Sequence, residues 1–148
     1  MLGQNVVLLR FLGPLEVVVD GHTVHPGGPK QRALLCHLVL HAGEPVSIPA
    51  LVEAVWGDEA PDGAIRSLRT YVSSLRRLLG PAADLRGEQG TYRLDIRSIE
   101  TDIDNFRTAV KEAATLENPR QRSDMLGTAL DLWRGPFLAD VDRPWVQE

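Results

Sequence analysis

The sequence is poor in cysteine and has no long apolar run. Its single cysteine, Cys36, has no disulfide partner, which excludes a disulfide framework and fits a reducing compartment. The apolar run from Val6 to Leu12 is interrupted by Arg10 and is too short to span a bilayer. We therefore expect no signal peptide, no membrane partner and a cytoplasmic location.

The sequence also lacks the residue constellations of an enzyme. No nucleophile, general base or metal cluster is visible, and residues 27–30 (GGPK) lack the spacing of a nucleotide-binding loop. His37 and His41 share one helix face at a spacing of four, but no acidic motif accompanies them. We predict a protein that is not an enzyme, with no catalytic residue, no metal and no cofactor.

Charge is unevenly distributed along the chain. Acidic residues outnumber basic ones by 20 to 16, a net charge of −4 that argues against indiscriminate binding to polyanions. Between residues 63 and 97, however, the basic residues are Arg66, Arg69, Arg76, Arg77, Arg86, Arg93 and Arg97, against only Asp84, Glu88 and Asp95. A local basic surface on an acidic chain is compatible with a specific DNA-binding protein.

The clearest helix signal in the sequence runs from Asp62 to Gly80. Its apolar residues recur at steps of three and four, which predicts one buried stripe of a helix: Ile65, Leu68, Val72, Leu75 and Leu79. Asp62 is a good N-cap, Gly80 stands where a C-terminal cap glycine belongs, and Pro81 prevents continuation.

The opposite face of this predicted helix is free of acidic residues. It carries Arg66, Thr70, Ser73 and Arg77, flanked by Arg69 and Arg76 on one side and by Ser67 and Ser74 on the other. Arginine can neutralise phosphate or hydrogen-bond guanine, while short hydroxyl side chains admit the DNA backbone closely. For an isolated helix, a merely solvated face would be the simpler interpretation.

The flanking segments favour DNA binding. Residues 6–24 predict a small antiparallel sheet with a hairpin turn at Asp20-Gly21, and two helices follow, over residues 29–43 and 47–57, with Ser47 as an N-cap. Residues 84–96 predict a β-hairpin in which Arg86 could reach the DNA backbone or minor groove. We predict an α+β winged helix-turn-helix over residues 1–98.

Residues 99–148 predict a separate, all-α helical-repeat segment. One helix begins between Thr101 and Asp104, with an apolar stripe at Ile103, Phe106, Val110 and Ala114. A second begins at Asn118-Pro119 and ends at Gly135-Pro136, with apolar residues Met125, Leu126, Ala129, Leu130 and Trp133. We interpret Trp56 and Trp133 as core anchors, and the pattern assigns no element to residues 137–148. Because helical repeats need about three copies to bury a core, we expect more helices after Glu148.

Several motifs together resemble a known family. They are LRFLGPLEV, GGPKQRALL, EAVWGDEAP, LRTYVSSLRRLLG, GTYRLD, DIDNFRTAV and ALDLWRGPFLADV. These motifs, which cover nearly the whole chain, are similar to those of the Streptomyces antibiotic regulatory proteins (SARPs), which join an OmpR-type winged helix to a bacterial transcriptional activation domain. The resemblance implies a transcriptional activator of antibiotic or other secondary-metabolite genes. Such activators bind direct-repeat promoter elements, usually as a tandem dimer, and recruit RNA polymerase through its sigma and alpha subunits.

The resemblance also assigns residues. It implies base contacts by Arg69, Thr70, Ser73 and Ser74, and DNA-backbone contacts by Arg66, Ser67, Tyr71, Arg76 and Arg86. Helix periodicity alone would place Arg77 where the resemblance has Ser74. Lys30 and Arg32 are candidate phosphate contacts or, equally, a solvated helix start. Asp58 and Glu59, in the loop before the basic helix, are candidate polymerase contacts.

The sequence departs from the family in one respect. The activation domain stops after two helices and a tail, which puts dimerisation and regulation through it in doubt. The 148 residues also show no receiver, nucleotide-binding or forkhead-associated module. The competing hypothesis is a protein-interaction module whose basic helix docks an acidic partner.

Overall fold

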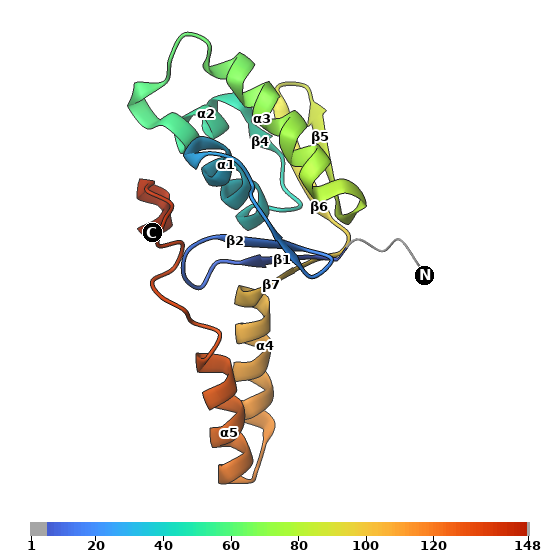
Figure 1. Ribbon diagram of the computed structural model, residues 1–148, viewed down its shortest axis with the longest axis vertical. Helices are drawn as coiled ribbons and strands as arrows, with labels where there is room; N and C mark the ends of the chain where they lie inside the picture. The colour runs from blue at the N-terminus through green and yellow to red at the C-terminus, as the bar shows by residue number, and fades with distance from the viewer. Residues whose placement is uncertain (1–5, 148) are drawn as a thin grey trace.

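The structure, a computed structural model, describes residues 6–147 and begins with a small sheet (Figure 1). Its first three strands are antiparallel neighbours, as predicted: β1 (Val7–Arg10), β2 (Glu16–Val19) and β3 (His22–Val24). Asp20 and Gly21 form the tight turn with φ of 50° and 83°. A fourth strand, β7 (Ile99–Thr101), pairs parallel to β1 with Val7 opposite Ile99. The strand β7 was not predicted, since three residues are too few to show an alternating pattern.

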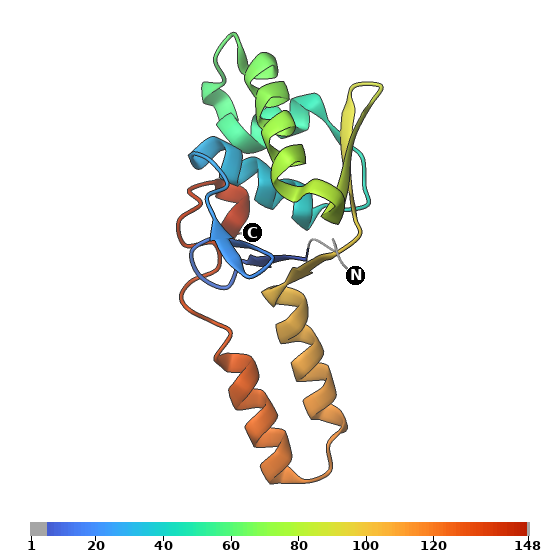
Figure 2. The ribbon, with the colours of Figure 1, turned by 45° about the vertical axis from the view of Figure 1, so that its right-hand side comes forward.

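Three helices and a second sheet follow. The helices are α1 (Pro29–Leu40), α2 (Ile48–Trp56) and α3 (Ala64–Leu79). The sheet has the order β4-β6-β5 and contains β4 (Val46–Ser47) and the hairpin of β5 (Ala83–Glu88) and β6 (Thr91–Ile96). This order of sheet, three helices and hairpin confirms the predicted α+β winged helix-turn-helix (Figures 1 and 2).

Local sequence accounts for most of the helix ends. Pro29 occupies the first turn of α1, where its missing N–H costs nothing. The Ser47 hydroxyl accepts a hydrogen bond from the Ala50 N–H at 3.1 Å, which confirms it as the N-cap of α2. Gly57 and Gly80 end α2 and α3 with φ of 63° and 53°, values that favour glycine.

The start of α3 differs from the prediction. Gly63, not Asp62, is the N-cap, and it makes no side-chain capping hydrogen bond. The chain instead enters the helix through a turn in which the Ala64 N–H donates to the Pro61 carbonyl at 3.0 Å. Ile65 was predicted to be buried but is 48% exposed, whereas Leu68, Val72, Leu75 and Leu79 are buried as expected. In the first turn of α3 the core instead covers Ala64, and Ile65, about 100° further round the helix, lies at the edge of the covered face.

Residues 102–130 form a helical hairpin that projects from the sheet (Figure 1). Thr101 caps α4 (Asp102–Thr115) by accepting from the Asp104 N–H, and Asn118 caps α5 (Pro119–Leu130) by accepting from Arg120 and Gln121. Both helix starts were predicted. Among residues 6–147, no helix has the length and apolarity needed to cross a bilayer.

The buried side of this hairpin was predicted less well. Ala113, not Ala114, is buried, and Val110 is 40% exposed. The helix α5 ends at Leu130, five residues before Gly135, and Leu130 and Trp133 are exposed rather than core residues. Trp133 instead contacts Phe106 edge-on at 5.8 Å. Within residues 6–147, α4 packs mainly against α5, and Val110, Leu130 and Trp133 remain exposed on this pair.

Residues 131–147 return from the hairpin to the winged helix, which the sequence pattern did not predict. Leu138 and Val141 are buried in the same core as α1, α2 and α3. The short 3-10 helix η3 (Pro144–Gln147) lies near α1 and α2 (Figure 2). The segment has no periodic pattern, because it is held by isolated contacts rather than by one continuous face.

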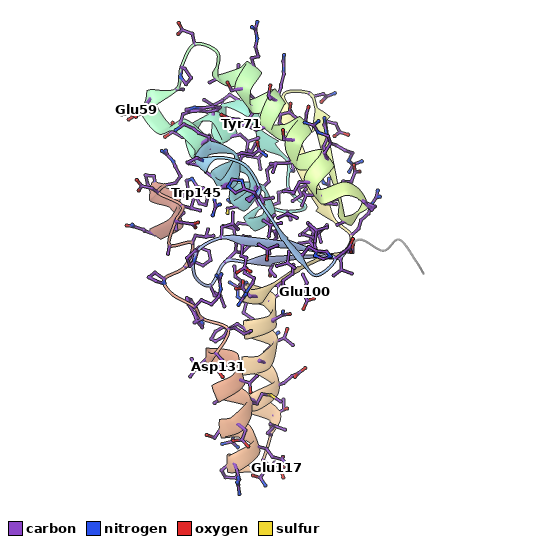
Figure 3. The ribbon with its side chains drawn as sticks, viewed as in Figure 1. Glu59, Tyr71, Glu100, Glu117, Asp131 and Trp145 are labelled. Carbon is purple, nitrogen blue, oxygen red and sulfur yellow. The ribbon has the colours of Figure 1, made fainter. Side chains whose placement is uncertain are left out.

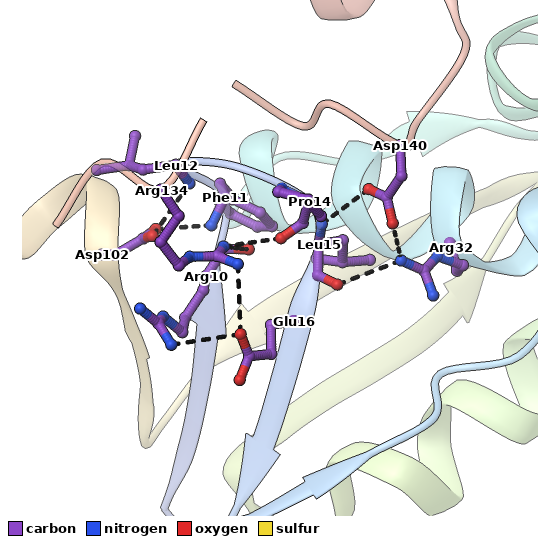
Figure 4. A network of polar contacts seen from close by, with 10 residues as sticks. All are labelled: Arg10, Phe11, Leu12, Pro14, Leu15, Glu16, Arg32, Asp102, Arg134 and Asp140. Carbon is purple, nitrogen blue, oxygen red and sulfur yellow. Dashed lines mark hydrogen bonds and ion pairs between the residues drawn. The ribbon is translucent and has the colours of Figure 1, made fainter. Parts of the chain in front are cut away.

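Carboxylates join the two parts of the chain (Figure 4). The buried Asp102 side chain accepts from the backbone N–H groups of Phe11 and Leu12 at 2.7 and 3.0 Å. Asp140 accepts from the Leu15 N–H at 2.8 Å and also pairs with Arg32. Arg134 donates to the Pro14 carbonyl at 2.7 Å and pairs with Glu16 at 3.3 Å.

Arg32 has internal partners that would compete with phosphate. It is half-buried, and its guanidinium also donates to the Leu15 carbonyl at 3.2 Å. The parts of the chain before residue 98 and after residue 99 contact each other, for example through Asp102 and Asp140. The domain boundary at that point stays a prediction. Lys30, two residues earlier on α1, is exposed and remains available to a ligand.

We expect Asp102→Ala to lower the free energy of unfolding by about 2–4 kcal/mol, because two buried N–H groups would lose their acceptor. Asp102→Asn should cost less, since one amide oxygen can still accept. The control is Asp104→Ala, which removes an exposed carboxylate from the same helical turn. Urea unfolding measures all three variants. Equal effects at residues 102 and 104 would contradict the role of the buried carboxylate.

His37 makes the free energy of unfolding depend on pH. Burial and, secondly, the nearby His41 lower the pKa of His37 from 6.5 to about 4. Its Nδ1 atom is buried with no hydrogen-bond partner among the described residues. The unfolded chain therefore binds a proton between pH 6.5 and 4 that the folded chain does not bind.

We expect the free energy of unfolding to decrease as the pH falls through this range, by about 1–3 kcal/mol attributable to His37. Urea unfolding of the wild-type chain and of His37→Gln at pH 7.5 and pH 4.5 isolates this contribution, which the variant should lack. His22→Gln, at an exposed position in β3, is the control and should retain it. The same pH dependence in both variants would assign the effect to other groups.

Candidate nucleic-acid interface

The outward face of α3 gathers most of the predicted DNA-contact residues. Burial of Leu68, Val72, Leu75 and Leu79, each at most 2% exposed, fixes which side of the helix faces the solvent. The predicted residues on the exposed side are Arg66, Arg69, Thr70, Ser73, Arg76 and Arg77. Ser67, Tyr71 and Ser74 are half-buried at its edge. The predicted residues therefore form one continuous surface, and their contact with DNA stays a prediction.

The arginines of α3 carry uncompensated charge. Within residues 6–147, none of Arg66, Arg69, Arg76 and Arg77 lies within 4 Å of a carboxylate. Arg76 is the most constrained of them, because its Nε donates to the Leu85 carbonyl of β5 at 2.8 Å. This hydrogen bond connects α3 to the hairpin. It leaves the remaining guanidinium nitrogens of Arg76 free to face a phosphate.

Two of the half-buried residues have structural contacts. Tyr71 stacks on Trp56 at 6.0 Å, so its ring packs α3 against α2. Ser74 lies beside the loop before α1, in a hollow also lined by Gly27 and Gln31. Arg77 is exposed at the rim of that hollow, and its Nη2 lies 3.5 Å from the Ser74 hydroxyl. Exposure thus favours Arg77 over Ser74 as the residue that reaches a ligand.

The β5–β6 hairpin, the wing, has largely compensated charge. Arg86 pairs with Asp84 at 3.2 Å and with Asp95 at 2.6 Å, and Arg93 pairs with Asp95 at 2.9 Å. The hydrogen bond to Asp95 raises the pKa of Arg86. Hydrogen bonds from Arg93 and Arg86 lower the pKa of Asp95. Arg86 is exposed, as a DNA contact must be, but two aspartates compete with phosphate for its charge.

The loop between α2 and α3 has the opposite charge. It begins with the 3-10 turn η1 (Gly57–Glu59), which carries the exposed Asp58 and Glu59. Figure 3 shows Glu59 on the outer side of this connection. Neither carboxylate takes part in an ion pair within residues 6–147. Asp62, which does not cap α3, adds a third exposed carboxylate to the loop.

Other chemistry has little support. The part of the chain that the structure describes contains no group of three or more histidine, cysteine or acidic side chains placed to hold a metal. Burial raises the pKa of the Cys36 thiol to about 12, so it is not a ready nucleophile. Arg143 and Trp145, which no sequence motif indicated, both contact the last turn of α2. No local pattern could have found them, because their partner lies about 90 residues earlier.

Comparison with known proteins agrees with this architecture. Residues 22–91 match the family described as transcriptional regulatory protein, C terminal. Residues 101–148 match the bacterial transcriptional activator domain. A solved structure of Mycobacterium tuberculosis EmbR in complex with a low-affinity phosphopeptide superposes with a TM-score of 0.81. It is 36% identical in sequence, and the match covers 97% of this chain and 40% of that one.

Three curated relatives are regulators. The transcriptional regulatory protein EmbR of M. tuberculosis is 41% identical over 88% of this chain and 36% of its own length. The regulatory protein AfsR of Streptomyces coelicolor is 38% identical over 94% of this chain and 14% of its own length. The regulatory protein DnrI of Streptomyces peucetius is 36% identical over 90% of this chain and 54% of its own length. The chain thus spans between about a seventh and about half of the length of these relatives.

The two family matches follow each other along the chain, and the winged helix agrees with the solved EmbR structure. The comparisons indicate a regulator and no catalytic family. Together these findings show that the chain belongs to the SARP type of transcriptional regulators.

Proposed function

We propose that this chain binds promoter DNA sequence-specifically through α3 and activates transcription from it. The observation that carries the proposal is the exposed face of α3, where four arginines have no carboxylate partner among the described residues of a net acidic chain. Uncompensated arginine on a protruding helix fits the phosphate-lined major groove. A protein of this kind acts in the cytoplasm, where the bacterial chromosome lies.

The predicted contact residues of α3 divide into two groups by position and chemistry. Arg69, Thr70 and Ser73, near the middle of the exposed face, would contact base edges, together with Arg77 or Ser74. Arg66, Ser67, Tyr71 and Arg76 lie toward the ends and edges of the face, where phosphates flank the groove. Base contacts would determine sequence preference, and phosphate contacts would position the helix.

The family also suggests how the chain assembles on promoters. SARP-type regulators bind direct repeats, so two copies would lie head to tail on the DNA and use unlike surfaces for contact. We propose this arrangement here, with genes of antibiotic or other secondary metabolism as targets. Recruitment would proceed through the sigma and alpha subunits of RNA polymerase.

The test of the main proposal is selection of duplexes from a random pool, followed by measurement of affinity for selected and random DNA at one salt concentration. A specific DNA-binding protein should prefer the selected duplex by about a thousandfold or more. Binding of a basic helix to an acidic protein would also weaken as the salt concentration rises, but such a protein would show no preference between the two duplexes. Equal affinity for both duplexes would overturn the proposal.

We expect Arg69→Ala to weaken binding to the selected duplex by about 1–3 kcal/mol and to relax preference at one or two base pairs. The matched control is Arg120→Ala, which removes an exposed arginine from the distant end of the α4–α5 hairpin. Competition binding with single-base variants measures the change. Equal losses on selected and random DNA would instead make Arg69 a phosphate contact.

We expect Arg86→Ala to weaken binding to every duplex alike and to reduce the slope of log affinity against log salt by about one unit. Asp95→Asn should act in the opposite direction, because it releases Arg86 and Arg93 from their shared partner. Salt titrations on selected and random duplexes measure both variants. Unchanged slopes in both would place the wing away from DNA.

We expect the double change of Asp58 and Glu59 to Ala to reduce transcription while operator affinity stays within about threefold, a shift below 1 kcal/mol. These exposed carboxylates would complement basic surfaces of sigma or alpha. The control removes two carboxylates of the distant hairpin, Glu117 and Asp131, in the same way. Purified polymerase and a promoter template at saturating protein provide the assay. Full transcription by the double variant would contradict the polymerase contact.

A further inference from the structure

The C-terminal end of α2 is held by residues far away in the sequence. The last four carbonyls of a helix have no partner within the helix, and that of Ala54 is one of them because α2 ends at Trp56. The last turn of α2 contains no basic residue that could complement the negative end of the helix dipole. The Gly57 N–H donates to the Glu53 carbonyl, whereas the donors to the Ala54 carbonyl come from elsewhere.

Arg143 and Trp145 supply them. The Arg143 Nε donates to the Ala54 carbonyl at 3.0 Å, and the Trp145 Nε1 donates to the same oxygen at 2.9 Å. Both donors come from the segment that follows the helices of the activation domain. The guanidinium also places a positive charge at the negative end of the α2 dipole.

Gly57 makes this approach possible. It begins the loop to α3 with φ of 63°, and a Cβ there would lie 2.7 Å from the Arg143 Nη2. Any side chain at this position would strain the backbone and displace the guanidinium. The residue that ends α2 is thus also the residue against which Arg143 packs, immediately before Asp58 and Glu59.

The donors are themselves well anchored. Val141 is buried in the core, and Asp140 is bonded to the Leu15 N–H at 2.8 Å. The Trp145 ring packs edge-on against His37 of α1 at 5.1 Å. These contacts seat residues 140–145 on α1 and the sheet, so the donors can restrain α2 rather than move with it. Figure 3 shows Trp145 on the same side of the molecule as Glu59.

We propose that Arg143 and Trp145 are positioning residues for the α2–α3 loop. By holding the last turn of α2 they fix where Asp58 and Glu59 are presented, so that the activation-domain segment determines the orientation of the acidic loop beside the recognition helix. Loops and helix ends open more easily than cores, and loss of these hydrogen bonds should allow this turn to fray. The consequence for transcription rests on the polymerase contact proposed above.

The test uses Trp145→Phe, which keeps the aromatic ring and removes the donor, and Arg143→Met, which keeps the stem and removes the charge. Hydrogen exchange of the amides of residues 56–60 should become about fivefold faster in each variant. Exchange in α3 and operator affinity should stay unchanged, while transcription at saturating protein falls. Arg143→Lys keeps a positively charged donor and should restore slow exchange.

Two control variants separate the local effect from general loosening. Trp133→Phe changes an exposed tryptophan next to α5. Arg134→Met removes a tail arginine that donates to the Pro14 carbonyl rather than to α2. Neither should speed exchange at residues 56–60.

The outcomes distinguish this proposal from the one on which it rests. Faster exchange confined to residues 56–60, with reduced transcription, supports both. Faster exchange there with full transcription supports the positioning role and overturns the polymerase contact of the loop. Unchanged exchange in both Trp145→Phe and Arg143→Met overturns the positioning role, whatever transcription does. Uniformly faster exchange across the chain also overturns it, because Arg143 and Trp145 would then serve only overall stability.

Discussion

Burial of one side of α3 is the constraint on which the rest of the molecule depends. Leu68, Leu75 and Leu79 reach the core shared with α1 and the sheets, and this packing leaves the helix no freedom to rotate. The arginine face must then point outward, whatever it binds. The same core contacts set the distance from α3 to the wing, where Arg76 bonds the Leu85 carbonyl. Position and direction of the candidate interface thus follow from apolar packing on its reverse side.

Acidic residues have different tasks in different places, which is how a chain with net charge −4 can present a basic surface. Asp102 and Asp140 are used within the fold, where they accept hydrogen bonds from backbone N–H groups near the end of the sheet. Asp95 forms ion pairs with Arg86 and Arg93 of the wing and so compensates part of their charge. Asp58 and Glu59 remain exposed beside α3, so a basic and an acidic surface adjoin each other. Adjacent surfaces of opposite sign suit a protein that contacts DNA and a second macromolecule at once.

The sequence predicted what depends on local pattern and missed what depends on distant contacts. The stripe of α3, the caps at Ser47 and Asn118 and the hairpin at Asp20-Gly21 each follow from neighbouring residues, and the structure confirms them. Periodicity failed for Ile65, because steps of three and of four before Leu68 fit one stripe equally well, and the core covers Ala64 rather than Ile65. The tail was beyond prediction for another reason: its contacts are single residues that meet Ala54 or Leu15 from far along the chain. Helix geometry determines which α3 side chains are exposed, so the sequence could predict that these residues share one surface. Helix geometry does not determine which base or phosphate each side chain would contact.

The position of the acidic loop depends on both halves of the chain. A helix end needs external donors, and the Ala54 carbonyl of α2 receives them from Arg143 and Trp145. The Arg143 guanidinium thereby lies against Gly57, the first residue of the loop. Gly57 allows this by accepting a positive φ next to a guanidinium, a combination that a residue with a Cβ could not adopt without strain. If the tail left its site, the Ala54 carbonyl would lose both of these donors. The last turn of α2 would then open more easily, which links the docking of residues 140–145 to the surface beside α3.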